Sequence, residues 1–244
     1  MKGAIWLRHC PGFDKEKAVQ GMFSSIARFY DLNNTLLSFG LHHRWKVRTI
    51  QTASLQTGER VADVGAGTAD LSILAAHAVG EKGSVIAIDL NEPMLQIGRR
   101  KLSARRLRQT ACSLGNAERL PLPDRSVDAV LTGFCMRNVS DLDQALREIH
   151  RVLKPGGRMV CLEFSTPPGP ALRKLYDFYS FTLLPKIGTW VSKDHTGVYS
   201  YLPDSIRKFP DQEGLKKRME SAGFRKVTYE NLTGGIVAIH VGSK

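Results

Sequence analysis

The sequence is poor in cysteine and offers no obvious set of metal ligands. It holds four cysteines in 244 residues, and no two of them form a Cys-x-x-Cys pair. This spacing is unlike that of a zinc site or a disulfide-rich secreted domain, and it is typical of a reducing compartment. We therefore predict no bound metal and no disulfide framework.

Long apolar runs, internal repeats and low-complexity linkers are also missing. Near the N-terminus only four apolar residues stand in a row, Ala4 to Leu7, which is too few for the core of a signal peptide. No uncharged run approaches the roughly 20 residues that span a bilayer. We expect a cytoplasmic protein, which would contact a membrane only from outside.

Positive charge is present in excess. Thirty-five Lys and Arg stand against 23 Asp and Glu, for a net charge of +12. Such a balance favours anionic partners, namely nucleic acid, an anionic membrane surface or acidic metabolites. A basic surface that is simply solvated explains it equally well.

From about residue 60 onward, apolar runs typical of strands alternate with helical patterns. The strand candidates are 60–66, 84–90, 109–117, 126–134 and 157–164, and the helix candidates between them are 68–79, 92–105 and 141–154. This alternation predicts a parallel sheet covered by helices on both faces. The last two strand candidates, 226–233 and 235–243, are too close for a parallel crossover, so they should pair antiparallel.

Local signals bound the helix predicted over 141–154. Asp141 precedes its apolar stripe and is a typical N-cap residue. Pro155 cannot continue the helix, and the two glycines that follow it permit a turn into the next strand.

Two segments lie outside the alternation. Residues 1–56 carry helical spacing from about residue 13, so we predict a helical N-terminal cap. Residues 166–205 are rich in aromatics and interrupted by proline, and they are inserted on the side of the sheet where ligands enter. We interpret them as a helical lid or substrate insertion within a single domain, which ends in a helix and hairpin over 206–244.

The stretch VADVGAGTAD places Gly65 and Gly67 between a strand and a helix. In a dinucleotide site a third glycine follows, and backbone N–H groups bind a pyrophosphate. Here Asp70 takes that position, and its carboxylate would repel a pyrophosphate but tolerate a ligand with a cationic end. S-adenosylmethionine, with its ammonium and sulfonium groups, is such a ligand. A tight turn that binds nothing is the alternative.

Polar side chains also stand at successive strand ends. Asp63 lies two residues before Gly65 and brings a second carboxylate near the loop. Asp89 ends the next strand, where an acid usually accepts both hydroxyls of a ribose. Asn116 follows the third strand and can reach an adenine edge. Together with the glycines, these residues predict a nucleoside site.

Stretches from nearly end to end match one known family. They are MFSSIARFYDLNNTLLSFGLHHRWK, VADVGAGTADL, IDLNEPML, GNAERLPLPD, RNVSDLDQALREIHRVLKPGGRMVCLEFSTP, SIRKFPDQEGLKKRMESAGF and NLTGGIVAIH. Through them the chain resembles the UbiE/MenG family of quinone C-methyltransferases. The resemblance implies a Rossmann-like class I methyltransferase fold with a seven-stranded, mostly parallel sheet, whose core over 57–165 binds S-adenosylmethionine.

The resemblance also implies a reaction and cofactor contacts. A methyl group passes to a ring carbon of a polyprenyl quinol, either demethylmenaquinol or a methoxylated benzoquinol, and a neighbouring phenol must lose its proton. The family's cofactor positions fall on Thr68, Asp89, Asn116 and Ala117. A serine contact of the family falls on Gly133, where only a backbone contact can survive.

The candidate catalytic residues are few. Arg137 and Asn138 follow the fourth strand, where the methyl group should sit. Arg137 is expected to stabilise a phenolate, and an ion pair with an acid such as Asp141 is the alternative. Asn138 is expected to hold a quinol oxygen or a water. Tyr30 is expected to close over the methyl group, with simple helix packing as the alternative.

Three histidines complete the candidates. His42 and His43 are runner-up bases because imidazole titrates near neutral pH, although surface or capping roles are commoner. His240, on the last strand, is predicted to be structural.

A prenyl tail ties the implied substrate to a bilayer, so we predict peripheral contact with an anionic membrane at its inner face. The lid offers Tyr176, Phe178, Tyr179, Phe181, Leu183, Leu184 and Trp190, flanked by Arg173, Lys174 and Lys186. Aromatics with basic flanks suit the headgroup boundary. The alternative is that they line a tunnel for the tail. As partners, a second copy of the chain in a homodimer and other enzymes in a quinone-biosynthesis complex are both open alternatives.

Two other functions compete. The net charge suggests a methyltransferase that acts on nucleic acid, or on another lipid or small molecule. However, there is no added basic domain and no Asn-Pro-Pro-Tyr-type motif after the fourth strand, so we predict no nucleic-acid partner. A non-catalytic module is disfavoured by the intact Gly65, Gly67, Asp89 and Arg137.

Overall fold

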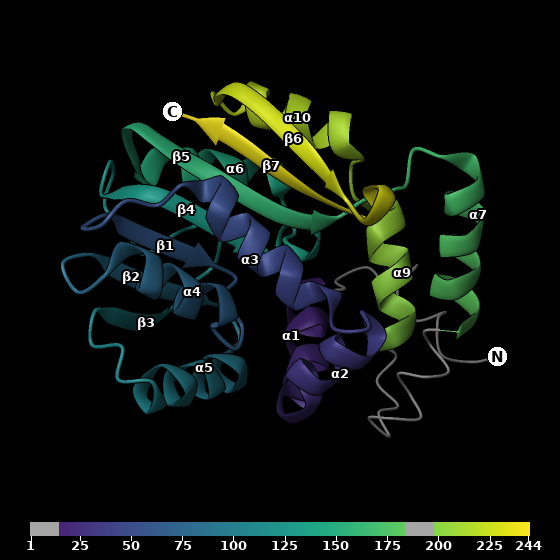
Figure 1. Cartoon of the computed structure of the whole chain (residues 1–244), viewed down its shortest axis with the longest axis horizontal. Helices are drawn as coiled ribbons and strands as arrows, with labels where there is room; N and C mark the ends of the chain where they lie inside the picture. The colour runs from purple at the N-terminus through teal and green to yellow at the C-terminus, as the bar shows by residue number, and fades with distance from the viewer. Residues whose placement is uncertain (1–14, 184–197) are drawn as a thin grey trace.

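A computed structural model describes residues 15–183 and 198–244 (Figure 1). In this part of the chain one sheet has the strand order β3-β2-β1-β4-β5-β7-β6. The strands are β1 Arg60–Val64, β2 Ser84–Asp89, β3 Thr110–Leu114, β4 Val127–Gly133, β5 Leu153–Phe164, β6 Arg225–Leu232 and β7 Val237–Ser243. Strands β1 to β5 pair in parallel, and β7 runs antiparallel between β5 and β6. The predicted seven-stranded sheet with its antiparallel hairpin is therefore confirmed.

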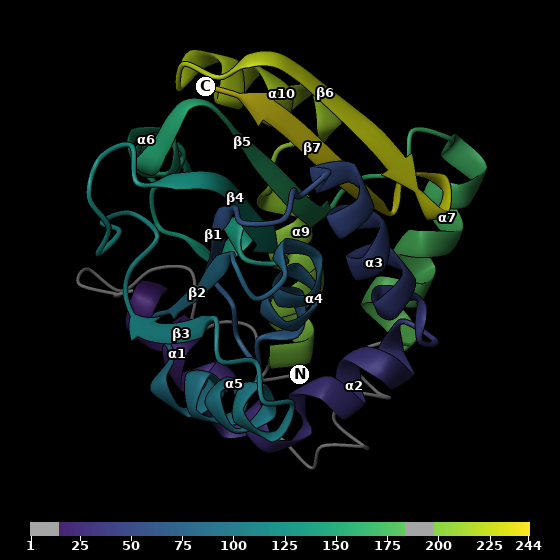
Figure 2. The same cartoon turned by 60° about the vertical axis from the view of Figure 1, so that its left-hand side comes forward.

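Helices cover both faces of the sheet. On β5, Met159 and Cys161 pack in the cluster of α6 (Leu142–Val152) and α10 (Gln212–Ser221), whereas Val160 and Leu162 pack on the opposite face. Figure 2 looks onto that second face, which carries α3 (Leu41–Ala53), α4 (Asp70–Val79) and α5 (Glu92–Ala104). Burial on both faces explains why the central strands are apolar without alternation.

The N-terminal segment divides into two parts. The described part begins with α1 (Lys15–Ile26), a short 3-10 turn (Ala27–Phe29) and α2 (Tyr30–Leu37). Gly40, in the left-handed conformation, then turns the chain into α3. Trp45 and Ala53 of α3 are buried against the sheet. The predicted cap is thus helical, but its last helix is a layer of the core rather than part of a cap.

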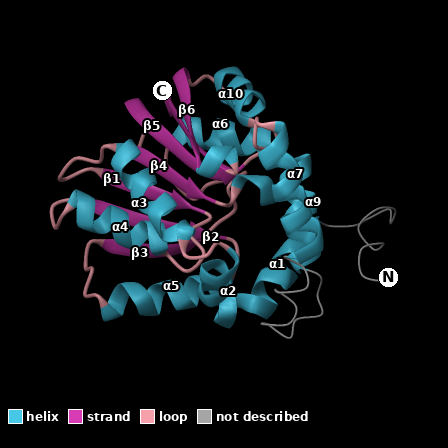
Figure 3. Ribbon diagram, turned by 45° about the vertical axis from the view of Figure 1, so that its right-hand side comes forward, coloured by secondary structure: helices cyan, strands magenta, loops and turns pink. Residues whose placement is uncertain are grey.

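The lid is also helical where it is described. It contains α7 (Pro170–Phe178), a π-helical turn (Tyr179–Leu183) and α9, which runs from Val198 to Lys208 and so passes the predicted end at 205. Leu184, Lys186 and Trp190 lie outside the described residues. Helices α1, α2, α7 and α9 gather at the end of the sheet to which the parallel strands point (Figure 3). None of the described helices is long and apolar enough to cross a membrane.

The bounds of α6 follow from local chemistry. Asp141 caps the helix as predicted, because its carboxylate accepts a hydrogen bond of 2.9 Å from the Gln144 N–H. The helix ends at Val152, earlier than predicted, because Leu153 already pairs with Val127 of β4. The pairing then skips to Arg158, so the Pro-Gly-Gly stretch forms an irregularity at the start of β5.

Candidate active site

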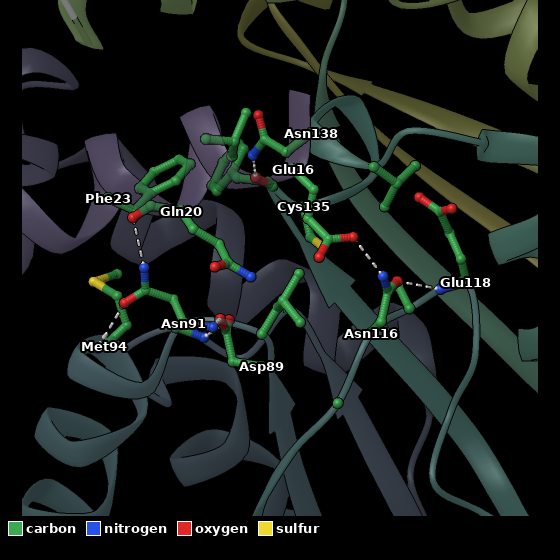
Figure 4. A pocket seen from close by; sticks show the side chains of 18 of the residues that line it. Glu16, Gln20, Phe23, Asp89, Asn91, Met94, Asn116, Glu118, Cys135 and Asn138 are labelled. Atoms are coloured by element: carbon green, nitrogen blue, oxygen red, sulfur yellow. Dashed lines mark hydrogen bonds between the residues drawn. The ribbon is translucent and has the colours of Figure 1, made fainter. Parts of the chain in front are cut away.

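Loops from four parallel strands enclose a cavity of about 120 Å³, which we call the loop cavity (Figure 4). Its wall includes most of the predicted cofactor residues: Gly65, Gly67, Asp89, Asn116, Ala117 and Gly133. They meet because the carboxyl ends of parallel strands lie along one edge of the sheet. The structure thus brings these six residues together, and their role in cofactor binding stays a prediction.

Backbone conformation explains the two glycines of the first loop. Gly65 has φ 72° and Gly67 has φ 54°, values that disfavour side chains. A Cβ on Gly65 would also collide with the Cys135 side chain. Ala69 also takes a left-handed conformation, with φ 66°. At Gly65 and Gly67 the loop therefore lines the cavity with backbone atoms alone.

Asp89 is held at the cavity wall by backbone donors. The N–H of Gly67 donates to Asp89 Oδ2 and the N–H of Asn91 to Oδ1, both at 2.7 Å. Burial raises the pKa of Asp89, and these two hydrogen bonds act against the rise. Each carboxylate oxygen keeps a second lone pair, so Asp89 remains able to accept hydroxyl groups.

Helix α1 closes the loop cavity from the other side. Asn116 Nδ2 donates to Glu16 Oε2 at 2.8 Å, and Asn91 Nδ2 donates to the Gln20 carbonyl at 2.9 Å (Figure 4). Phe23, one turn further along α1, also lines the cavity. Sequence reasoning missed these α1 residues because nothing within a helix indicates which distant loop it covers.

Asp63 does not line the loop cavity, and its role as a cofactor contact stays a prediction. It is only 1% exposed and accepts a hydrogen bond of 2.6 Å from the Ser72 hydroxyl of α4. Burial raises the pKa of Asp63 to about 7, despite the bonds from Ser72. This hydrogen bond joins the end of β1 to α4.

Thr68 and Asp70 likewise do not line the loop cavity. The Thr68 hydroxyl donates to Asp31 Oδ1 of α2 at 2.6 Å. Asp70 pairs with Lys46 at 2.7 Å and with Lys101. Although burial opposes it, these lysines lower the pKa of Asp70 to about 2. The cofactor contact of Thr68 stays a prediction, and two lysines pair with the Asp70 carboxylate.

A second, larger cavity of about 470 Å³ lies between the N-terminal helices and the lid. We call it the lid cavity. Its lining is mostly apolar and aromatic. Phe23, Tyr30 and Phe134 line both cavities. Tyr30 therefore lies at the junction of the two cavities, and its closing over the methyl group stays a prediction.

Arg137 is a buried cation in the wall of the lid cavity. It is 9% exposed, and its Nη1 donates to Glu163 Oε1 at 2.6 Å and to the Phe134 carbonyl at 2.7 Å. Nε is buried without a hydrogen-bond partner among the described residues. Burial opposes the charge, but Glu163 raises the pKa of Arg137 above its ordinary value. An ion pair exists, as the alternative interpretation held, but its acid is Glu163 and not Asp141.

Other polar groups surround the junction. Asn138 lines the loop cavity, donates to the Phe134 carbonyl at 3.2 Å and accepts from the Tyr201 hydroxyl at 3.2 Å. Burial raises the pKa of Tyr30, so its phenol stays protonated and acts as a donor. A Cβ on Gly133 would lie 2.7 Å from Leu71 Cδ1, so a larger residue at this position requires the Leu71 side chain to shift.

The histidines differ in position. His42 lines the lid cavity, but burial and the nearby Lys46 lower its pKa to about 4, which makes it a poor base toward a phenol. His43 is exposed on the outside of α3. His240 is buried and its Nε2 lies 2.8 Å from the Gln212 carbonyl, in accord with the predicted structural role.

Comparison with known proteins gives consistent results. The sequence profile of the ubiE/COQ5 methyltransferase family matches residues 13–244. A protein of Shewanella sp. strain ANA-3, named ubiquinone/menaquinone biosynthesis C-methyltransferase UbiE, is 47% identical over 231 residues, which cover 94% of this chain and 92% of that protein.

Two solved structures share the fold. A SAM-dependent methyltransferase of Thermotoga maritima, described as a possible histamine N-methyltransferase, has a TM-score of 0.62 at 21% identity and covers 91% of this chain and 100% of its own. The cyclase SpnF has a TM-score of 0.69 at 17% identity and covers 94% of this chain and 96% of its own. Since one of these is named a cyclase, the fold alone does not fix the reaction.

Proposed function

The chain belongs to the ubiE/COQ5 methyltransferase family, and from this premise we propose that it methylates a ring carbon of a polyprenyl quinol. The methyl donor is S-adenosylmethionine, and the product belongs to menaquinone or ubiquinone biosynthesis, as the name of its Shewanella relative states for that protein. The observation that carries the proposal is the meeting of the loop cavity and the lid cavity at Tyr30, beside the buried cation Arg137.

The loop cavity suits the methyl donor. When bound, S-adenosylmethionine supplies a methyl group activated by a sulfonium, which is a good leaving group. In this proposal Asp89 binds the ribose hydroxyls, Asn116 and Ala117 flank the adenine, and the bare backbone of Gly65 and Gly67 borders the remainder. The fit rests on the Asp89 carboxylate, which two backbone N–H groups hold in place while lone pairs remain for a ligand.

The lid cavity suits the acceptor ring. Glu163 balances the charge of Arg137 and holds its guanidinium in place, which leaves a preorganised donor for a neighbouring oxygen. Its Nε–H, which has no partner in the described part of the chain, would face the phenol oxygen next to the reacting carbon. Arg137 would lower the pKa of that phenol and hold the phenolate, while Tyr30 and Asn138 position the ring at the junction.

Arg137→Lys provides the test of this function. We expect the purified wild type to transfer a labelled methyl group from S-adenosylmethionine to a short-tailed demethylated quinol. The lysine variant keeps a charge but loses Nε and the planar fork, so kcat should fall at least about tenfold. Calorimetric affinity for S-adenosylmethionine should stay nearly unchanged, because Arg137 does not line the loop cavity.

Two results would contradict this proposal. A wild type that labels tRNA or DNA but no quinol would replace the proposed acceptor with nucleic acid. An Arg137→Lys variant with normal turnover would leave Arg137 a purely structural ion pair. Complementation of two strains, each lacking one quinone methylation step, then distinguishes a benzoquinol from a naphthoquinol substrate.

We further propose that the mouth of the lid cavity rests on an anionic membrane. Three of its lining residues are largely exposed: Phe39 (80%), Leu175 (64%) and Phe178 (56%). Tyr179 joins the two sides of this rim, because its hydroxyl donates to the Leu37 carbonyl at 2.7 Å. Exposed basic residues, Arg173 and Lys174, stand beside it on α7. An apolar rim with basic neighbours suits the headgroup boundary.

Sedimentation with vesicles tests this docking. We expect binding to anionic vesicles at low salt, weakened by high salt because each basic residue near the surface contributes about 1 kcal/mol that ions screen. Phe39→Ser with Phe178→Ser should reduce binding strongly. Leu114→Ser, at an apolar residue that is 49% exposed on β3 and away from the rim, is the matched control. A wild type that stays in the supernatant would mean that a partner protein delivers the quinol.

A further inference from the structure

His42 has a fixed tautomer in the wall of the lid cavity. The Thr35 hydroxyl donates its proton to the Asp31 carbonyl at 2.8 Å, so its oxygen is left as an acceptor. His42 Nε2 lies 3.1 Å from that oxygen, and with the hydroxyl proton on the Asp31 side it is assigned as the donor of this hydrogen bond. The ring is neutral, because burial and Lys46 lower the pKa of His42 to about 4. Nδ1 is therefore a bare acceptor.

No described residue donates a hydrogen bond to that acceptor. His42 is 3% exposed, and Nδ1 has no hydrogen-bond partner among the described residues. A buried acceptor without a partner costs free energy. Two further buried polar side chains, Asn33 and Ser180, line the same cavity. Because the rest of the cavity is mostly apolar, these three polar side chains indicate where a polar atom of a ligand could bind.

His42 and Arg137 are separated along the cavity wall by aromatic rings. The Arg137 guanidinium carbon lies 5.2 Å from the centre of the Phe164 ring, and the ring centres of Phe164 and Trp45 are 6.3 Å apart. His42 stands nearly one turn before Trp45 on α3. His42 and Arg137 thus line the lid cavity together with Trp45 and Phe164, against which a flat ring could lie.

We propose that His42 Nδ1 accepts a hydrogen bond from the quinol hydroxyl para to the one that Arg137 faces, and thereby selects the reduced ring. This inference rests on the proposed function. A quinol hydroxyl donates a proton to Nδ1, whereas the carbonyl of the oxidised quinone offers only lone pairs and is repelled. The discrimination serves the reaction, because only the reduced ring has a phenol whose proton can leave.

Binding of the two ring forms tests the inference without turnover. Titrations are done without oxygen on the full chain with S-adenosylhomocysteine, using a short-tailed demethylated naphthoquinol and its quinone. We expect the wild type to bind the quinol at least about tenfold more tightly, the usual effect of a buried partner gained or lost. His42→Phe should bring the ratio of the two Kd values close to one, mainly by weakening the quinol.

Two further variants separate recognition from damage to the fold. His42→Asn places an oxygen acceptor near the position of Nδ1 and should keep part of the preference. His43→Phe changes the exposed neighbouring ring and should behave as the wild type. A His42→Phe variant that keeps the wild-type ratio overturns the inference, as does a wild type that binds both forms equally. A wild type that binds neither form and methylates no quinol instead overturns the proposed function.

Discussion

Replacing Glu163 by alanine should lower the free energy of unfolding by about 3–5 kcal/mol. Glu163 is 1% exposed, and it is the described acid that pairs with the buried Arg137. Its Oε1 also accepts the Phe164 N–H at 2.9 Å. Without the carboxylate, a buried cation and a backbone donor both lose their partner. Urea unfolding, followed by circular dichroism, measures the loss as a lower midpoint.

An exposed ion pair provides the matched control for Glu163. Arg48 Nη2 lies 3.0 Å from Glu230 Oε2, and the two side chains are 49% and 40% exposed. Glu230→Ala should cost less than about 1 kcal/mol because water screens the pair. If Glu163→Ala costs no more than Glu230→Ala, the buried pair is not what holds Arg137 in place.

Asp89→Ala should weaken the affinity for S-adenosylmethionine by about 2–4 kcal/mol. The substitution removes an acceptor for two ribose hydroxyls. It also frees the Gly67 and Asn91 N–H groups that now hold the carboxylate, so the loop loses its fixed shape as well. Calorimetric titration of the folded variant measures the change.

Asp63→Asn is the comparison that distinguishes the role of Asp63 from that of Asp89. Asp63 is buried beneath the loop and does not line the loop cavity. Asparagine keeps an acceptor for the Ser72 hydroxyl, so the affinity should stay within about threefold of the wild type. Unchanged affinity in Asp89→Ala would remove Asp89 from the site, and a large loss in Asp63→Asn would support the predicted cofactor contact of Asp63.

The parts of the fold that could be predicted are those with short-range causes. The Asp141 cap needs only a neighbour three residues away, and strand ends converge because parallel strands end on one edge. The choice of Glu163 as the partner of Arg137 depends instead on the pairing of β4 with β5, which sets Gly133 opposite Leu162. A glutamate inside the apolar run GRMVCLEF was the available signal.

Contacts made by the N-terminal helices were beyond sequence reasoning. The sequence predicts that Asp70 tolerates a ligand with a cationic end. In the structure Lys46 of α3 and Lys101 of α5, both distant in the chain, pair with its carboxylate. Helical periodicity shows that a helix has a buried face but not which partner covers that face. The same limit hid Glu16 and Phe23 from the predicted site.

The shared wall of the two cavities makes their ligands thermodynamically dependent on each other. Three residues line both cavities: Phe23, Tyr30 and Phe134. The ligand that binds first restricts the motion of these side chains, so the second ligand loses less conformational entropy when it binds. Free-energy linkage is reciprocal. The methyl donor therefore changes the affinity for the quinol by the same factor as the quinol changes the affinity for the donor.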